Sequence, residues 1–232
     1  MTKILSTVGP VSEGKNLDYL VKRSDLIRLN MSHNSIKWHK KNINQIKKIA
    51  PYKMILIDIP GIKPRTLNEN SIKIKKGELI EFGTNKLKNN LINLSSPLPK
   101  IKKNTKSFSL SDGAYEFKFI SCKKNILKGM SLQSFTLSTK KGLNIPLSIY
   151  NNLLQEKKYV SFLKKIKKFN FDCVGLSFIQ NSKIINLLRK QHPNKLFISK
   201  IENYLGYINR KEIIENSDAI MIDRGDLSAE VG

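Results

Sequence analysis

Cysteine and long apolar runs are both scarce in this chain of 232 residues. The two cysteines, Cys122 and Cys173, are too far apart for a zinc site and too few for a disulfide scaffold, so we expect ordinary thiols in a reducing compartment. No apolar stretch approaches the length of a membrane span, and Met1 is not followed by the charged and then apolar segments of a secretory leader. The sequence therefore predicts a cytoplasmic protein with no membrane partner.

Acidic residues and arginine are also few. There are 42 Lys+Arg against 18 Asp+Glu, a formal net charge of +24, yet only six of the basic residues are arginine. Such an excess is typical of proteins that bind nucleic acid, anionic membranes or phosphorylated small molecules, but A/T-rich codons alone can supply many lysines. The lysines are spread along nearly every predicted helix and loop, and their densest run, at 157–168, is typical of a solvated helix face. We therefore expect a phosphorylated small molecule rather than nucleic acid as the partner.

Apolar residues follow strand-like and helix-like patterns in turn. They make up 40% of the chain, which is enough for a folded protein, and runs such as 53–58 are typical of parallel strands covered on both faces. The predicted strands lie at 3–8, 25–30, 53–58, 172–178, 195–202 and 219–223. The predicted helices lie at 16–22, 35–49, 148–170, 182–190 and 210–216. Six such units predict an α/β fold, either a (β/α) barrel without its last two units or an open doubly wound sheet.

The middle of the chain has a different pattern of apolar and polar residues. Short alternating segments at 71–74, 78–81, 117–121 and 131–138 are separated by glycine-containing turns. This pattern predicts a small β-domain at 67–140, inserted into an α/β domain made of 1–66 and 141–232.

Charged residues of both signs lie where the predicted strands end. In parallel α/β folds, the carboxyl ends of the strands and the loops that follow them carry the functional groups. The cations at these ends are Arg28, Arg65, Lys200 and Arg224, and the acids are Asp58, Glu202, Asp223 and Asp226. This mixture suits an anionic, phosphorylated substrate held partly through a divalent metal, because carboxylates bind the ion and cations bind phosphate oxygens.

Several of these motifs together resemble those of the pyruvate kinase family. The motifs are Arg28-Leu29-Asn30-Met31-Ser32-His33, the element from Asp58 to Thr66, Asp112-Gly113, the segment from Lys140 to Pro146, Lys200-Ile201-Glu202-Asn203, and the segment from Ser217 to Leu227. The resemblance covers essentially the whole sequence. It implies a pyruvate kinase-type (β/α) barrel, incomplete at about six units, with the mobile lid of the family at 67–140. The family's last two barrel units and its C-terminal domain are absent from this sequence.

The resemblance also implies an activity and a role for particular residues. The activity is transfer of phosphate from phosphoenolpyruvate to ADP, giving pyruvate and ATP in glycolysis, with Mg²⁺ or Mn²⁺. The matching residues are Arg28 and Lys200 for catalysis, Arg28, Gly225 and Asp226 for substrate, Arg65 and Lys141 for nucleotide, Glu202 and Asp226 for Mg²⁺, and Asn30, Ser32 and Asp58 for a monovalent cation.

The sequence departs from the family at several of these places. Ile59 offers no oxygen where the family often has threonine, so Asp58 either binds a cation or orients its neighbours through hydrogen bonds. Lys63 stands where potassium-dependent members carry glutamate, and an ammonium there predicts that K⁺ is not required. Gln180 replaces a residue that is commonly basic, and Asp223 replaces a small apolar one and is expected to pair with Arg224.

A second hypothesis is a pyruvate kinase-like chain with impaired catalysis that binds a ligand or a protein partner. In either case the open edges of the first and sixth strands invite aggregation unless they are covered. We therefore expect that a homo-oligomer or a second chain completes the barrel, or that the sequence is a fragment of a longer protein.

Overall fold

The computed structural model describes residues 2–84 and 91–231. The chain forms two compact units, each built from separate segments. The first comprises Met1–Gly61, Glu156–Lys200 and Lys211–Met221, and the second comprises Ile62–Gln155, Ile201–Arg210 and Ile222–Gly232.

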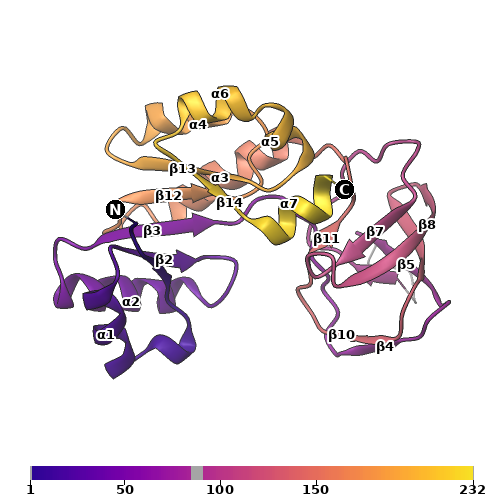
Figure 1. Cartoon of the computed structure of the whole chain (residues 1–232), viewed down its shortest axis with the longest axis horizontal. Helices are drawn as coiled ribbons and strands as arrows, with labels where there is room; N and C mark the ends of the chain where they lie inside the picture. Colours follow the sequence, from indigo (N-terminus) through magenta and orange to yellow (C-terminus); the bar gives the residue numbers. More distant parts are fainter. Residues whose placement is uncertain (1, 85–90, 232) are drawn as a thin grey trace. The chain divides into compact units, whose positions relative to one another are not determined.

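A six-stranded sheet forms the centre of the first unit (Figure 1). Its strands, in spatial order, are β1 (Leu5–Thr7), β2 (Leu26–Asn30), β3 (Met54–Ile59), β12 (Cys173–Leu176), β13 (Leu196–Ile201) and β14 (Ala219–Ile222). The pairs β1–β2, β2–β3, β3–β12 and β12–β13 are parallel, and the sheet is curled into part of a barrel. Five of the six strands lie within predicted segments, and β3 extends one residue beyond its segment at 53–58, so the prediction of an incomplete (β/α) barrel is confirmed.

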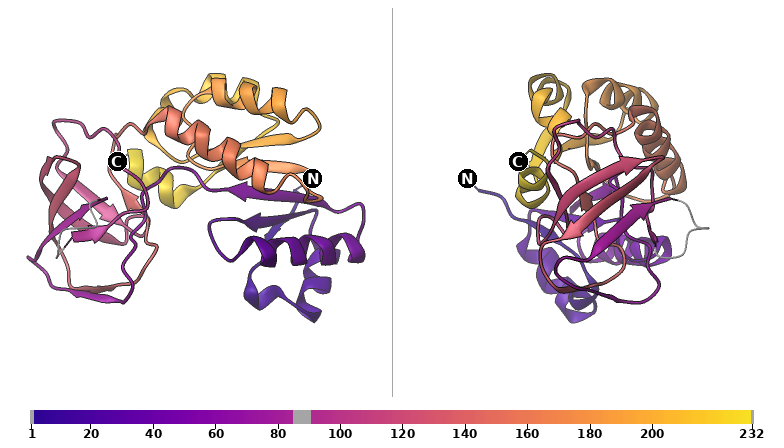
Figure 2. Two further views of the ribbon diagram at one scale, coloured as in Figure 1. Left: turned by 180° about the vertical axis from the view of Figure 1, so that it is seen from behind. Right: turned by 90° about the vertical axis from the view of Figure 1, so that its right-hand side faces the viewer.

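Helices connect these strands and bury their apolar faces against the sheet. They are α1 (Lys15–Arg23), α2 (Ile36–Ile49), α3 (Asn152–Lys165), α4 (Ser182–Gln191) and α6 (Arg210–Asn216), with a 3-10 turn, η1, at Pro10–Ser12. Ser35 and Asn181 cap the starts of α2 and α4 by accepting hydrogen bonds from main-chain N–H groups. Figure 2 shows α3 and α4 along one face of the sheet, where Leu163 and Leu188 belong to its buried core. The helix predicted at 148–170 is shorter than expected, because 148–151 lies before it with only an isolated bridge at Ile149 and 166–169 follows it in turn and bend conformation.

Two sheets make up most of the second unit. One has the order β11 (Leu143–Asn144), β7 (Ser107–Leu110), β8 (Tyr115–Lys123), β9 (Ile126–Ser131), β5 (Leu79–Gly83) and β6 (Leu91–Asn93). The other pairs β10 (Phe135–Leu137) with β4 (Ile72–Ile74). The rings of Phe82, Phe108 and Phe117 meet in the core of this unit, with centroids 5.0 to 5.7 Å apart. The segment predicted at 131–138 is not one strand, because Ser131 ends β9 and the chain turns before β10 begins.

Two helices of the second unit follow barrel strands. They are α5 (Tyr204–Ile208), which follows β13, and α7 (Arg224–Val231), which follows β14. Helix α5 begins directly after the motif Lys200–Asn203, and α7 begins within the motif from Ser217 to Leu227, so both motifs stand at helix starts.

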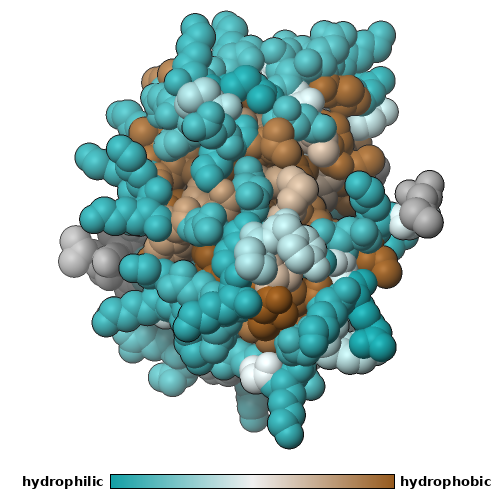
Figure 3. Space-filling model, turned by 90° about the vertical axis from the view of Figure 1, so that its left-hand side faces the viewer, coloured by the Kyte–Doolittle hydropathy of each residue, from teal (hydrophilic) through white to brown (hydrophobic). Residues whose placement is uncertain are grey.

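The edges and surface of the chain remain rich in apolar side chains. Strands β1 and β14 are the outermost strands of their sheet within the described residues. Ile4, which precedes β1, is 56% exposed, and Ile222, the last residue of β14, is 62% exposed. Figure 3 shows hydrophobic patches between long hydrophilic side chains on one face. Among the helices that the structure describes, none combines the length and the apolar character needed to cross a bilayer.

Candidate active site

Asp58 holds two predicted catalytic cations in the first unit. Its Oδ2 accepts hydrogen bonds from Arg28 Nε at 2.9 Å and Nη2 at 2.5 Å, and lies 3.2 Å from Lys200 Nζ. Its Oδ1 accepts a bond from Ser177 Oγ at 2.9 Å. The side chains of Asp58 and Lys200 are only 1% and 5% exposed, so these charges interact with little screening by water. We call Arg28, Asp58, Ser177 and Lys200 the Asp58 cluster.

The strand order brings the Asp58 cluster together. Asp58 lies in β3, which pairs with β2 on one side and β12 on the other, and its direct neighbours in register are Asn30 and Gly175. A Cβ atom on Gly175 would lie 3.2 Å from Asp58 Cα and 3.3 Å from Asp58 Oδ1, so glycine leaves the room that this carboxylate occupies. Four chain segments that are distant in sequence therefore converge because their strands are adjacent in one parallel sheet.

The residues predicted for a monovalent cation are adjacent but already bonded. The Asn30 side-chain oxygen accepts a hydrogen bond from Ser32 N at 3.0 Å, and both carboxylate oxygens of Asp58 accept the bonds described above. This geometry favours the alternative in which Asp58 orients Arg28 and Lys200 by hydrogen bonds.

Three carboxylates of the second unit form a group that can hold a metal ion. Glu202, Asp223 and Asp226 each offer an oxygen, and these oxygens lie within 4.8 Å of one another. Glu202 follows β13 directly, Asp223 stands between β14 and α7, and Asp226 lies in the first turn of α7. We call these three residues the carboxylate cluster. Hard carboxylate oxygens are the donors that Mg²⁺ and Mn²⁺ prefer, so the residues present fit the divalent metal that the sequence predicts.

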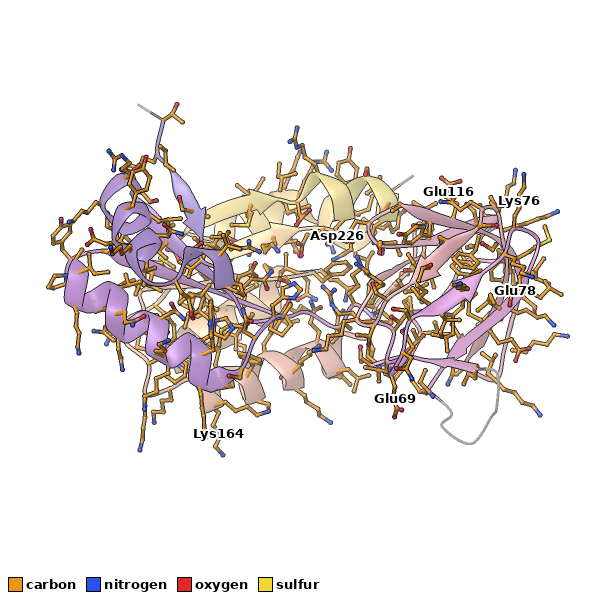
Figure 4. The ribbon with its side chains drawn as sticks, turned by 90° about the horizontal axis from the view of Figure 1, so that it is seen from below. Glu69, Lys76, Glu78, Glu116, Lys164 and Asp226 are labelled. Atoms are coloured by element: carbon orange, nitrogen blue, oxygen red, sulfur yellow. The ribbon has the colours of Figure 1, made fainter. Side chains whose placement is uncertain are left out.

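A buried lysine already contacts this cluster. Lys63 Nζ donates hydrogen bonds to Asp226 Oδ1 and, at 2.7 Å, to Asp112 Oδ1, and the Lys63 side chain is only 4% exposed. Burial alone would raise the pKa of Asp112, but the Lys63 ammonium outweighs it and lowers that pKa. Burial raises the pKa of Asp226, and Lys63 opposes that shift only in part. Figure 4 shows Asp226 directed inward from α7, whereas Glu116 of β8 projects outward.

The chain makes room for Lys63 at Gly142. A Cβ atom there would stand 2.5 Å from Lys63 Cε and 2.7 Å from Lys63 Nζ. A side chain at position 142 is therefore incompatible with the observed path of the lysine.

A second buried network supports Asp226. Asn144 Nδ2 donates to Asp226 Oδ1 at 3.2 Å and to Glu230 Oε1 at 3.0 Å, and Tyr150 Oη donates to Glu230 Oε1 at 2.9 Å. Glu230 is fully buried, and burial raises its pKa to about 8. Burial also raises the pKa of Tyr150 well above its usual value, and the neighbouring Glu230 adds to that rise.

The two residues predicted to contact nucleotide lie on paired segments of the second unit. Arg65 forms an antiparallel bridge with Gly142, the residue after Lys141, and Arg65 Nη1 donates to the carbonyl of Lys140 at 3.2 Å. The structure therefore brings Arg65 and Lys141 into the same stretch of the second unit.

Comparison with known proteins decides the family. The family model described as "Pyruvate kinase, barrel domain" matches residues 1–232. The chain belongs to the pyruvate kinase family. Among curated pyruvate kinases, that of Staphylococcus aureus (strain MRSA252) is 31% identical over 248 residues, and that of Thermococcus litoralis is 27% identical over 245 residues. The crystal structure of Cryptosporidium parvum pyruvate kinase superposes with a TM-score of 0.81 at 28% identity, covering 99% of this chain and 53% of that one.

The chain spans about half the length of the pyruvate kinases that it matches. Each curated alignment covers 99% of this chain but only 42% of the Staphylococcus aureus protein and 52% of the Thermococcus litoralis protein. The family assignment therefore concerns the part of a pyruvate kinase that holds the Asp58 cluster and the carboxylate cluster.

Sequence reasoning missed several residues of these clusters. It singled out neither Ser177 as a partner of Asp58, nor the contact of Lys63 with Asp226, nor the support by Asn144 and Glu230. Two of these residues carried a signal. Lys63 is a departure from the family pattern, but that signal pointed to K⁺ rather than to Asp226, and Asn144 lies in the motif from Lys140 to Pro146.

Proposed function

We propose that this chain transfers a phosphoryl group from phosphoenolpyruvate to ADP, giving pyruvate and ATP, as the pyruvate kinase reaction of glycolysis. The observation that carries the proposal is the Asp58 cluster, in which one buried carboxylate fixes Arg28 and Lys200 together. Phosphoryl transfer needs mainly positioning and neutralisation of charge, and two cations held in place before the substrate arrives meet that need.

The cations have distinct tasks in this proposal. The Arg28 guanidinium is planar and offers several N–H donors, which suits binding of phosphate oxygens. Two of its nitrogens bind Asp58 and a third, Nη1, donates to Thr7 Oγ1 at 3.0 Å, so the group has a fixed orientation. The Lys200 ammonium is a compact charge that stabilises the negative charge developing on the transferring phosphoryl and the enolate.

In the second unit, Glu202 and Asp226 are proposed to hold Mg²⁺ or Mn²⁺, which, when bound, supplies positive charge to the phosphoryl oxygens. Gly225 and Asp226 are proposed to border phosphoenolpyruvate, and Arg65 and Lys141 to contact the nucleotide. Because Lys63 places an ammonium beside Asp226, we propose that K⁺ is not required.

The test is a coupled assay for pyruvate with purified chain, phosphoenolpyruvate, ADP and Mg²⁺. We expect Lys200→Met to lower turnover by about a hundredfold to a thousandfold, the usual cost of losing one group that stabilises developing charge. The matched control is Lys164→Met, because Lys164 projects outward from α3 (Figure 4) and its loss should leave turnover unchanged. Equal turnover by the unmodified chain and the Lys200 variant contradicts the proposed mechanism.

A second candidate is a chain of this family that binds phosphoenolpyruvate without turning it over, or that needs a second copy or another chain to complete its barrel. The coverage of only 42% to 53% of its relatives favours keeping this candidate. Calorimetric binding of phosphoenolpyruvate with Mn²⁺, absent turnover, would support it, and native mass measurement distinguishes a single chain from an assembly.

A further inference from the structure

We propose that Asp223 supplies a third carboxylate ligand to the divalent cation, a role that rests on the proposed function of Glu202 and Asp226. Asp223 is one of the residues by which this chain departs from the family pattern. Its carboxylate belongs to the group whose oxygens lie within 4.8 Å of one another.

The position of the Asp223 side chain supports this role. Its Oδ1 lies 3.7 Å from the place where a Cβ on Gly225 would stand, so the carboxylate turns back over the first turn of α7. Asp226 lies in that same turn. Asp223 and Asp226 stand three positions apart at the start of α7, and Glu202 follows the end of β13. All three place an oxygen within 4.8 Å of the other two.

The negative charges of the carboxylate cluster favour binding of a divalent cation. Glu202, Asp223, Asp226 and the adjacent Asp112 carry four formal negative charges, and the buried Lys63 brings one positive charge to Asp226 and Asp112. The contact of Lys63 with Asp226 shows that a cation is accepted at this carboxylate. A divalent ion bound by three carboxylates would reduce the repulsion among their negative charges.

Asp223 also stands at the start of α7, where aspartate is a common helix cap. Its main-chain oxygen accepts a hydrogen bond from Leu227 N at 2.9 Å. Asparagine caps helices as well as aspartate but carries no charge, so Asp223→Asn separates the two roles.

The experiment measures Mn²⁺ binding to the full chain at fixed ionic strength, by calorimetry and by the electron paramagnetic resonance signal of free Mn²⁺. We expect Asp223→Asn to weaken binding about tenfold or more, because even partners behind metal ligands cost tenfold to a hundredfold when changed. The matched control is Glu215→Gln on α6, an exposed acid outside the cluster, which should bind Mn²⁺ like the unmodified chain. Circular dichroism melting confirms that Asp223→Asn folds.

The outcomes separate this inference from the proposed function. If Glu202→Gln weakens Mn²⁺ binding but Asp223→Asn stays within twofold of the unmodified chain, Asp223 is a helix cap only and the inference is overturned. If the unmodified chain binds no Mn²⁺, both the inference and the proposed metal site fail. If both variants weaken Mn²⁺ binding and the coupled assay shows no turnover, the inference stands and the proposed reaction fails.

Discussion

The Asp58 cluster and the carboxylate cluster are opposite in charge and in construction. In the first, one carboxylate lies between two cations and all the groups come from adjacent strands or the residue that follows one. In the second, three carboxylates lie together, one of them, Asp226, is paired with the Lys63 ammonium, and the groups come from a strand end, a loop and a helix start. The first has a cation in excess and suits an anionic substrate; the second has acids in excess and suits a divalent cation.

The two clusters also differ in the groups that stabilise their buried charges. The sheet fixes the Asp58 cluster through hydrogen bonds among protein groups alone. In the carboxylate cluster, Asp226 accepts hydrogen bonds from Lys63 and from Asn144, which also binds Glu230, and the cluster offers an oxygen from each of three carboxylates to a cation from solution. We therefore expect changes in the first cluster to act on folding and turnover, and changes at the second to act on folding and on metal binding.

The largest effect is expected at Asp58. Asp58→Asn removes the shared counter-ion of Arg28 and Lys200 and leaves two cations uncompensated, one of them buried. Breaking a buried ion pair from one side typically costs about 3–5 kcal/mol, so we expect a loss of that size in the free energy of unfolding, measured by urea titration.

The matched variant for this experiment is Ser177→Ala. It removes one hydrogen bond to Asp58 and no charge, for which we expect a loss of about 1 kcal/mol. Equal losses for the two variants would contradict the view that the charges of the cluster dominate its energy.

A smaller effect is expected at Lys63. Lys63→Met removes the ammonium from Asp226 and Asp112, and we expect a loss of about 3 kcal/mol without metal, at the low end for a buried pair because Asp112 is 57% exposed. Mn²⁺ should restore more stability to this variant than it adds to the unmodified chain, because the ion then takes over the charge of Lys63.

Thermal unfolding with and without Mn²⁺ measures this difference between the two chains. Lys76→Met, at an exposed position of the second unit, is the control and should behave as the unmodified chain does (Figure 4). A response to Mn²⁺ that does not differ between Lys63→Met and the control would separate Lys63 from the metal site.

The smallest effect concerns pH and Glu230. Its pKa is raised from 4.5 to about 8 in the folded chain, so between these values the folded state holds a proton that the unfolded state has lost. Stability must then fall as pH rises, by about 1.4 kcal/mol per pH unit, or about 2 kcal/mol from pH 6 to pH 7.5. Glu230→Gln cannot lose a proton and should show a flatter profile by that amount, measured by urea titration at several pH values. Parallel profiles for the two chains would exclude a buried neutral Glu230.

The barrel strands could be predicted from sequence because their patterns are strong and local. Strand β3 is almost entirely apolar, and Ser35 marks the start of α2 with a capping residue. Strands β6 and β11 have three and two residues, too few for any periodicity to emerge. Helix α7 begins Arg-Gly-Asp and has no clear apolar stripe, so its helical form depends on packing rather than on pattern.

Only those residues of the two clusters that lie in recognisable motifs could be predicted from the sequence. Arg28, Lys200, Glu202 and Asp226 lie in motifs whose order resembles a known family, and their placement at strand ends follows from the parallel sheet. The contact of Lys63 with Asp226 joins residues 163 positions apart, and the bond of Ser177 to Asp58 joins residues 119 apart. No local pattern encodes such pairs, because they depend on how the loops are packed.

The fit of Lys63 against Gly142 has a consequence for how this chain can evolve. The two positions share one small volume, so a residue larger than glycine at 142 requires either a shorter side chain at 63 or a different path for Lys63. A lineage that keeps Lys63 on its observed path must keep glycine at position 142. Lysine at position 63 thus restricts the residue at a position 79 further along the chain.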